Sequence, residues 1–321
     1  SRGLRQYAAL LADGLRPDVV IASSTHPFDA APARQIARLA GAASVFELHD
    51  LWPLSPIELY GFSPRHPLMQ LIERAERAAF LQSDAVVSVL PFAERYLDEQ
   101  GIAPQRYLHL PNGIGEREDA APPKSHCIAL ERLKKRYGFV TLYAGGFSAA
   151  NATEQFAALA RMLPEAGFAA IGDGPLREAL RREATDNLIF LDPVAHDALL
   201  PLLERADLLW ISTRPLAIYR YGLAMNKLFD YMSAGRPILL GASGGGEDPV
   251  SRAGCGAVVA PDDLDAMARA VETVRTMHPD ARRALGESGA RYVREHHFYP
   301  RLAAQYRSFL EELSDAIKKR Q

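Results

Sequence analysis

Cysteine is scarce in this chain of 321 residues, and neither a long apolar run nor an excess of one charge is present. The two cysteines, Cys127 and Cys255, lie far apart and match no zinc-binding or redox spacing, so we expect free thiols in a reducing compartment. No apolar stretch approaches the ~18 residues that a membrane-spanning helix requires. The first residues lack the apolar centre of a signal peptide, and we expect a cytoplasmic protein. Lysine and arginine number 37 against 39 acidic residues, so the basic excess typical of a dedicated nucleic-acid-binding protein is missing.

The residues that are present have the balance of a globular protein, with 48% hydrophobic and 24% charged residues. Short β-branched runs alternate with amphipathic helical stretches along the chain. The predicted strands are residues 18–23, 43–48, 84–89, 107–110, 139–144, 168–171, 187–191, 207–211, 237–240 and 257–259. Near-continuous apolar strands separated by helices favour parallel sheets that are covered on both faces. We therefore predict an α/β fold with two doubly wound, Rossmann-like domains in tandem.

Composition also predicts where the domains meet. Residues 116–126 are nearly free of apolar side chains at their start and contain two prolines, which is typical of a linker. The expected domains are then residues 1–115 and 127–298. Residues 299–321 form a last helix, whose large apolar side chains recur every three or four positions, and we expect it to pack back on the first domain.

Two glycine-rich turns in the second half are candidate phosphate-binding loops. Gly145 and Gly146 follow a predicted strand and lead through Asn151 into a helix, so backbone N–H groups there can bind an anion. Residues 172–174, with the sequence Gly-Asp-Gly, occupy the same kind of position after the next strand. A tight turn without a ligand explains either pattern as well.

A third candidate lies at the start of the predicted helix 224–233. Asn226 and Asp230 are four residues apart and share a helix face, with Lys227 beside them. A cation at a helix start and a carboxylate one turn later suit a phosphate and a ribose diol. A solvated Lys–Asp pair on a surface helix is the alternative. Because all three candidates fall at the carboxyl ends of strands or the helix starts beyond them, where open α/β sheets bind ligands, we expect one shared site.

In the first half, His49 and Asp50 follow a predicted strand and could carry acid–base or orienting chemistry, or His49 could serve only to bond a loop. Residues 263–265 read Asp-Leu-Asp, which resembles a metal-binding pattern, but their place at a helix start favours capping. His296 and His297 lie near a helix end, where their charge is favourable, and we expect no metal site.

Five spaced motifs resemble glycosyltransferases of family 4 with the GT-B fold, and in particular the branch that builds bacterial surface polysaccharides. The motifs are residues 47–53 (ELHDLWP), 110–114 (LPNGI), 143–146 (YAGG), 171–175 (IGDGP) and 226–237 (NKLFDYMSAGRP). Members of this family transfer a sugar from a nucleotide donor, held mainly by the C-terminal domain, to an acceptor held by the N-terminal domain. The resemblance implies that neither a metal nor a cofactor takes part.

The chain departs from the family pattern at three places. Many members carry two glutamates separated by seven residues; the second position is Asp230 here, but the first is Gly222. Many also hold the diphosphate with an arginine and a lysine at the positions of Gly146 and Asn151, so Lys227 becomes the expected cation. The family begins with a strand and a glycine-rich loop, whereas this chain opens on a helix-like stretch, residues 4–15, and about 60–90 residues of the first domain are expected to be missing.

These observations predict a glycosyltransferase that uses a nucleotide-diphosphate sugar, most simply a UDP-sugar, and a glycan or lipid-linked acceptor in surface polysaccharide synthesis. Lys227 and the helix starts at Asn151 and Asn226 would stabilise the leaving diphosphate. His49 and Asp50 would orient the sugar or the acceptor, and Asp230 would hold the ribose. The expected donor-binding residues are Gly145, Gly146, Asn151, Gly172, Asp173, Gly174, Val194, Asn226, Lys227 and Asp230.

Two further interpretations remain open. A protein without the N-terminal loop could be a non-catalytic remnant that binds a nucleotide or a partner enzyme. Basic clusters at residues 132–136 and 318–320 could contact anionic lipid at the inner membrane at roughly 1 kcal/mol per charge, although solvated helix faces explain them too.

Overall fold

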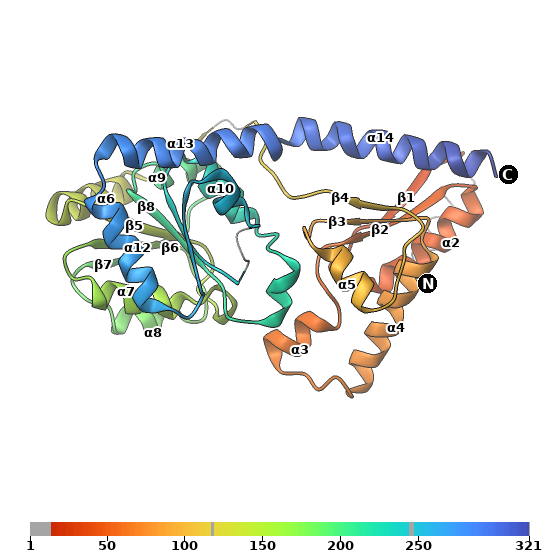
Figure 1. The fold of residues 1–321 in the computed structure, drawn as a ribbon, viewed down its shortest axis with the longest axis horizontal. Helices are drawn as coiled ribbons and strands as arrows, with labels where there is room; N and C mark the ends of the chain where they lie inside the picture. Colours follow the sequence, from red (N-terminus) through yellow and green to blue (C-terminus); the bar gives the residue numbers. More distant parts are fainter. Residues whose placement is uncertain (1–13, 117–118, 244–246, 321) are drawn as a thin grey trace. The chain divides into compact units, whose positions relative to one another are not determined.

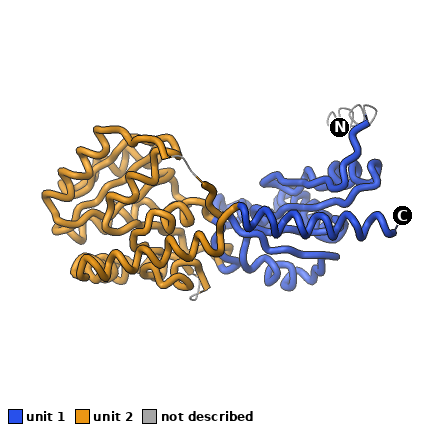
Figure 2. The backbone as a smooth tube through the Cα atoms, turned by 90° about the horizontal axis from the view of Figure 1, so that it is seen from above, with its two compact units in different colours: residues 1–112, 220–224, 300–321 blue, residues 113–219, 225–299 orange. Residues whose placement is uncertain are grey.

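The computed structural model describes residues 14–116, 119–243 and 247–320. The chain divides into two compact units, coloured separately in Figure 2. Unit 1 comprises residues 1–112, 220–224 and 300–321, and unit 2 comprises residues 113–219 and 225–299. The helix expected over residues 4–15 falls almost entirely outside the described residues.

Unit 1 is built on a sheet of four parallel strands in the order β1-β2-β3-β4. The strands are β1 (Val19–Ala22), β2 (Ala43–Leu48), β3 (Ala85–Ser88) and β4 (Tyr107–His109). The helices are α2 (Ala30–Ala40), α3 (Leu54–Tyr60), α4 (Pro67–Gln82), α5 (Ala93–Glu99) and α14 (Tyr299–Lys318), and a short 3-10 helix, η1 (Pro27–Asp29), precedes α2. All four strands occur where the apolar runs predict them. The helix α3 was not predicted, because its seven residues contain a proline and follow another.

The two faces of this sheet have different partners because successive strand residues point to opposite sides. Ala43, Val45, Ala85 and Val87 form a buried cluster with Leu313 of α14, which runs along the sheet in Figure 1. Phe46 belongs to the other set and meets Phe80 of α4 edge to face. The last helix of the chain is therefore part of the core of unit 1, where the sequence analysis placed its apolar face.

Unit 2 is a six-stranded parallel sheet in the order β10-β9-β8-β5-β6-β7. The strands are β5 (Val140–Ala144), β6 (Gly167–Ile171), β7 (Leu188–Leu191), β8 (Leu208–Ser212), β9 (Ile238–Gly241) and β10 (Gly256–Val259). The α-helices are α6 (Lys124–Tyr137), α7 (Thr153–Met162), α8 (Arg177–Arg182), α9 (Leu200–Leu203), α10 (Asn226–Ser233), α11 (Pro249–Ala253), α12 (Leu264–Thr276) and α13 (Pro279–His296). Three 3-10 helices, η2 (Ala149–Asn151), η3 (His196–Ala198) and η4 (Ala217–Tyr221), lie in loops, the last continuing into unit 1. Residues 124–126, which composition assigned to the linker, form the first turn of α6 instead.

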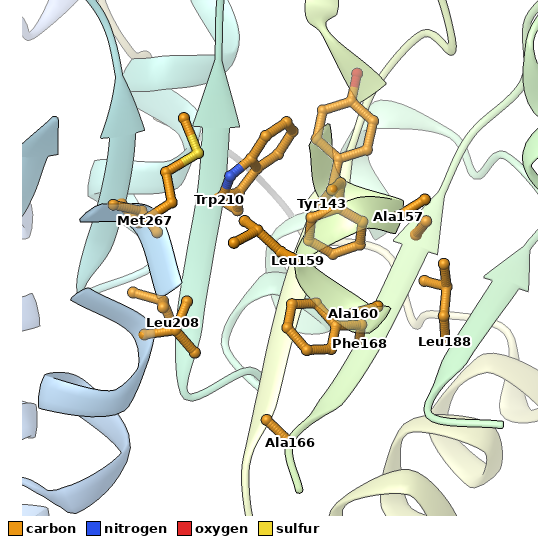
Figure 3. Close-up of a cluster of buried hydrophobic side chains, with 14 of the residues drawn as sticks. Tyr143, Ala157, Leu159, Ala160, Ala166, Phe168, Leu188, Leu208, Trp210 and Met267 are labelled. Atoms are coloured by element: carbon orange, nitrogen blue, oxygen red, sulfur yellow. The ribbon is translucent and has the colours of Figure 1, made fainter. Parts of the chain in front are cut away.

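The core of unit 2 lies between the sheet and the helices α7 and α12. Figure 3 shows Tyr143, Phe168 and Trp210, from β5, β6 and β8, among the side chains of α7 and Met267 of α12. Trp210 is fully buried, and its ring centroid lies 5.6 Å from that of Tyr143. This aromatic packing holds β5 and β8 side by side. Among the described helices of both units, none is at once long enough and apolar enough to cross a membrane.

Candidate functional site

The strand order of unit 2 reverses between β5 and β8, since β5 pairs with β6 on one side and β8 on the other. Open parallel sheets bind ligands outside the carboxyl ends of their strands at such a reversal. The loop after β5, the loop after β6 and the first turn of α10 all meet there, although they are far apart in the sequence. These are the three segments that the sequence analysis expected to share a site.

The loop after β5 is shaped by glycine and held by hydrogen bonds to the carbonyl of Gly146. Gly145 has a φ of +157°, and a Cβ at this position would lie 2.8 Å from the Tyr143 hydroxyl oxygen. That hydroxyl donates to the carbonyl oxygen of Gly146 at 2.7 Å, and Nδ2 of Asn151 donates to the same oxygen at 2.9 Å. The loop is thus a fixed turn, in which an added Cβ at Gly146 would make only ordinary contacts, none closer than 3.7 Å.

Lys227, at the start of α10, reaches this loop. Its Nζ donates to Oδ1 of Asn151 at 2.5 Å and lies 5.3 Å from the centre of the Tyr143 ring. Burial lowers the pKa of Lys227 to about 8. No carboxylate within the described part of the chain forms an ion pair with this ammonium group. A desolvated cation beside a glycine turn is suited to an anionic ligand.

The loop after β6 supports the first loop. The amide of Gly145 donates to the carbonyl of Ile171 and the amide of Phe147 to that of Asp173, each at 2.9 Å. A Cβ on Gly172 would lie 2.0 Å from the carbonyl oxygen of Gly145, and one on Gly174 would lie 2.5 Å from that of Phe147. This close approach of two backbones explains both glycines. The Asp173 carboxylate accepts from the amide of Gly174 at 2.8 Å and so serves the turn itself.

Asp230 lies one turn beyond Asn226 on α10 and is buried, whereas Asn226 is exposed. Its Oδ2 is 3.1 Å from Nε2 of His196, which belongs to η3 after β7 and is largely exposed. Val194 is half-buried in the same loop as His196. The sequence analysis missed His196. Only its position just beyond the carboxyl end of a strand could have indicated it.

Unit 1 has a polar cluster at the carboxyl ends of β1 and β2. Nε2 of His49 lies 3.2 Å from Oγ of Ser23, which follows β1, and 3.5 Å from Oε2 of Glu47 in β2. Ser23 also donates to Oε2 of Glu47, and the Tyr306 hydroxyl of α14 donates to Oε1 at 2.6 Å. Asp50 follows His49 and is exposed. The structure thus joins the predicted His49 to Ser23 and Glu47, and through Glu47 to Tyr306, three residues that the sequence analysis did not name as site residues.

Gly222 stands where many family members carry a glutamate, and its surroundings do not accommodate one. Its φ is +96°, a region that side chains rarely adopt, and an added Cβ would lie 2.2 Å from Cγ of Pro91. The neighbouring backbone is fixed as well, because the amide of Phe92 donates to the carbonyl of Tyr221 at 3.1 Å. A glutamate at position 222 would therefore require residues 220–224 or Pro91 to move.

Three other predictions from sequence concern charged residues outside these sites. Asp263 caps α12, since its Oδ1 accepts from the amide of Ala266 at 2.8 Å. No group of three or more His, Cys, Asp or Glu residues in the described ranges could hold a metal ion. Within the two basic clusters, Lys134 pairs with Asp207 at 3.0 Å and Lys318 with Asp18 at 2.7 Å.

Two family models match the sequence. Residues 1–113 match the glycosyl transferase 4-like domain, and residues 138–276 match the glycosyl transferases group 1 model. A comparison of the sequence with curated proteins finds no match.

Solved structures resemble the whole chain. Sucrose-phosphate synthase from Thermosynechococcus elongatus has a TM-score of 0.75 at 19% identity, over 98% of this chain and 77% of that one. The Anabaena protein HepE in complex with UDP and glucose has a TM-score of 0.70 at 15% identity, over 95% and 81%. A UDP-forming α,α-trehalose-phosphate synthase from Burkholderia vietnamiensis has a TM-score of 0.63 at 17% identity, over 97% and 75%. The predicted fold, with two parallel-sheet α/β domains of the GT-B type, is confirmed.

Proposed function

We propose that this GT-B glycosyltransferase moves a sugar from a UDP-sugar to a glycan or lipid-linked acceptor, and that unit 2 binds the donor. The observation that carries the proposal is the Lys227 ammonium, desolvated and without a carboxylate partner in the described residues, beside the Gly145–Gly146 turn. Similar structures support the choice of nucleotide, since HepE was solved with UDP and with UDP-glucose.

Each residue of the proposed donor site would contact a different part of the nucleotide sugar. Lys227 and Asn151, with the backbone at Gly146, would bind the diphosphate and stabilise the negative charge that develops there as the sugar bond breaks. Asp230 would accept hydrogen bonds from the ribose hydroxyls, and Val194 and Asn226 would border the nucleoside. The proposed reaction uses no metal and no cofactor besides the nucleotide sugar, because Lys227 supplies the positive charge.

We place the acceptor or the transferred sugar at His49 and Asp50, at the carboxyl edge of the unit 1 sheet. The proposed setting is bacterial surface polysaccharide synthesis in the cytoplasm, supported by the motif at residues 47–53. A peripheral contact with anionic lipid draws less support from the structure. Lys134 and Lys318 are already engaged by acidic residues, which reduces the charge that the basic clusters offer to a membrane.

One observation favours a second candidate, a protein that binds a nucleotide or a partner without transferring a sugar. The position of the first family glutamate is Gly222, and Pro91 fills the space that a side chain there would need. Such a protein would retain the donor site in unit 2, so nucleotide binding alone does not separate the two functions.

Two measurements, one of binding and then one of activity, test the proposal. Calorimetry with UDP in the absence of magnesium should show binding that Lys227→Ala weakens by ~1.5–3 kcal/mol, the range for a hydrogen bond to a charged group. Lys135→Ala is the matched control, since Lys135 is exposed on α6. Free UDP should then be released from UDP-sugars when acceptor glycans or lipid-linked glycans are added. Binding without release supports the second candidate, and a folded chain that binds no nucleoside diphosphate contradicts both.

A further inference from the structure

Glu47 is a charged residue on a strand face that is otherwise apolar. Side chains alternate along β2, so Glu47 points to the same side as Ala43 and Val45, which pack against Leu313 of α14. Only 17% of its side chain is exposed. Burying a carboxylate among apolar groups is unfavourable unless hydrogen bonds compensate, so this position calls for a reason other than packing.

Hydroxyl groups from two distant parts of the chain form hydrogen bonds with the Glu47 carboxylate and so compensate the cost of burying it. Tyr306, on the last helix, donates to Oε1 at 2.6 Å, and Ser23, just after the first described strand, donates to Oε2. Burial alone would raise the pKa of Glu47, but hydrogen bonds from His49, Ser23 and Tyr306 hold it below its ordinary value. The carboxylate is therefore ionised at neutral pH and fixed in place.

The third partner of this carboxylate is the ring of His49. Nε2 lies within reach of both Glu47 and Ser23, and no residue in the described part of the chain forms a hydrogen bond with Nδ1. The charged groups that face the ring are Glu47 from β2, the adjacent Asp50 and Asp29 at the end of η1, and all three are acidic. The hydrogen bond to Glu47 raises the pKa of His49, against a smaller effect of burial.

We propose that Tyr306, Glu47 and Ser23 act as positioning residues that hold His49 as a cationic hydrogen-bond donor to a substrate oxygen, and not as a general base. A base needs a lone pair on the imidazole. The Glu47 carboxylate at Nε2, with Asp50 and Asp29 also facing the ring, favours the doubly protonated form, which has no lone pair to offer. The remaining donor, Nδ1–H, suits a hydroxyl or phosphate oxygen of the sugar or the acceptor. This inference rests on the proposed transferase function for its substrate, but the state of the ring can be measured without one.

The first arm of the test is an NMR titration of the histidine ring resonances in the full chain, with His49 assigned from the spectrum of His49→Asn. The pKa of His49 should lie above the ordinary value in the wild type and fall in Glu47→Gln, because the opposite charge that favours the protonated ring is removed. Tyr299→Phe is the matched control on α14, because it removes the same hydroxyl from a tyrosine that is 48% exposed. An unchanged pKa in Glu47→Gln overturns the proposal.

The second arm is the pH dependence of UDP release. Lys227 also loses its proton near pH 8, so the comparison between variants is decisive. If His49 must be charged, Glu47→Gln shifts the alkaline loss of activity to lower pH. A general base predicts the opposite, since a lower pKa would extend activity toward acid.

Tyr306→Phe separates positioning from charge. It leaves the Glu47 charge in place, so His49 should keep its raised pKa, while kcat falls at least about tenfold because the ring is no longer held in one orientation. Ser23→Thr, which retains a hydroxyl, should keep more activity than Ser23→Ala. If the protein transfers no sugar, the NMR arm still decides the state of His49, and the failure then belongs to the proposed function.

Discussion

Replacing Lys227 by methionine should stabilise the unliganded protein and weaken its binding of UDP, two effects of opposite sign at one residue. The ordinary lysine pKa of 10.5 falls to about 8 at this position because of burial. Each pKa unit corresponds to 1.36 kcal/mol, so the buried ammonium reduces stability by about 3 kcal/mol at pH 7 as an upper bound. Methionine has a similar length and no charge, and it removes this cost.

The pH dependence of this effect follows from the direction of the shift. Between pH 8 and pH 10.5 the unfolded chain keeps its lysine proton while the folded protein has lost it, so the stability of the wild type rises with pH over this window. The advantage of Lys227→Met should therefore be full below pH 8 and vanish near pH 10.5. Affinity for UDP should fall in the wild type as the pH rises through about 8, and should stay low and flat in the variant.

Tryptophan fluorescence can follow the unfolding of unit 2. It has two tryptophans, and Trp210 lies in the core of unit 2, in ring contact with the Tyr143 that Lys227 covers. In a Trp52→Phe background, denaturant unfolding followed by tryptophan fluorescence reports on unit 2 alone. A Lys227→Met protein that is less stable than the wild type at pH 7, or that binds UDP equally well, would refute the argument that the buried Lys227 ammonium lowers stability and binds an anionic ligand.

Four further outcomes are expected. Asp230→Asn should weaken UDP more than it weakens a 2′,3′-dideoxy analogue in calorimetry, because a carboxylate can accept from both hydroxyls and an amide only in part; equal losses would give Asp230 another role. Gly172→Ala should destabilise unit 2 by more than about 1 kcal/mol in the same fluorescence assay, since its Cβ would lie 2.0 Å from a carbonyl oxygen, and a neutral result would mean that the two loops are not packed together. Leu313→Ala should cost ~2–5 kcal/mol and reduce hydrogen-exchange protection in β2 and β3; unchanged protection would mean that α14 does not dock on this sheet. Glu76→Gln should gain stability over the wild type as the pH rises toward 8, because burial raises the pKa of Glu76 to about 8 and its unfolded form ionises at lower pH; a difference that does not change with pH would contradict this.

The fold was predictable because each strand is a short apolar run that can be recognised from its own residues, without knowing which strands lie beside it. The runs around Val86 and Leu209, for example, are buried on both faces, so hydrophobicity alone marks them. The helix α6 was not predicted, and the linker was extended into its first turn, because Lys124, Ser125 and His126 are polar and composition alone resembles that of a linker. Local sequence therefore predicts the apolar strands better than it predicts polar helices.

The residues of the proposed donor site could be picked out in the sequence for the same local reason, whereas their partners could not. Lys227 and Asn151 stood out as polar groups at the ends of elements, but their contact joins positions 76 residues apart. Tyr306 is more instructive still. In the sequence it is one member of an apolar helix face, and only the fold shows that its hydroxyl meets a carboxylate 259 residues away.

Gly222 shows how far a motif can be interpreted without its surroundings. In the sequence it is a missing glutamate, which suggests a lost function. In the structure its backbone adopts a φ of +96°, with Pro91 against the space of a Cβ and Asn112 donating to the nearby carbonyl of Ala224 at 2.7 Å. The substitution belongs to a segment that is fixed by its contacts within unit 1, so restoring a glutamate would require residues 220–224 to adopt another conformation. The polar side chains that the proposed donor site can use are therefore those that the structure gathers at the end of the unit 2 sheet, Lys227 with Asn151 and Asp230 with His196.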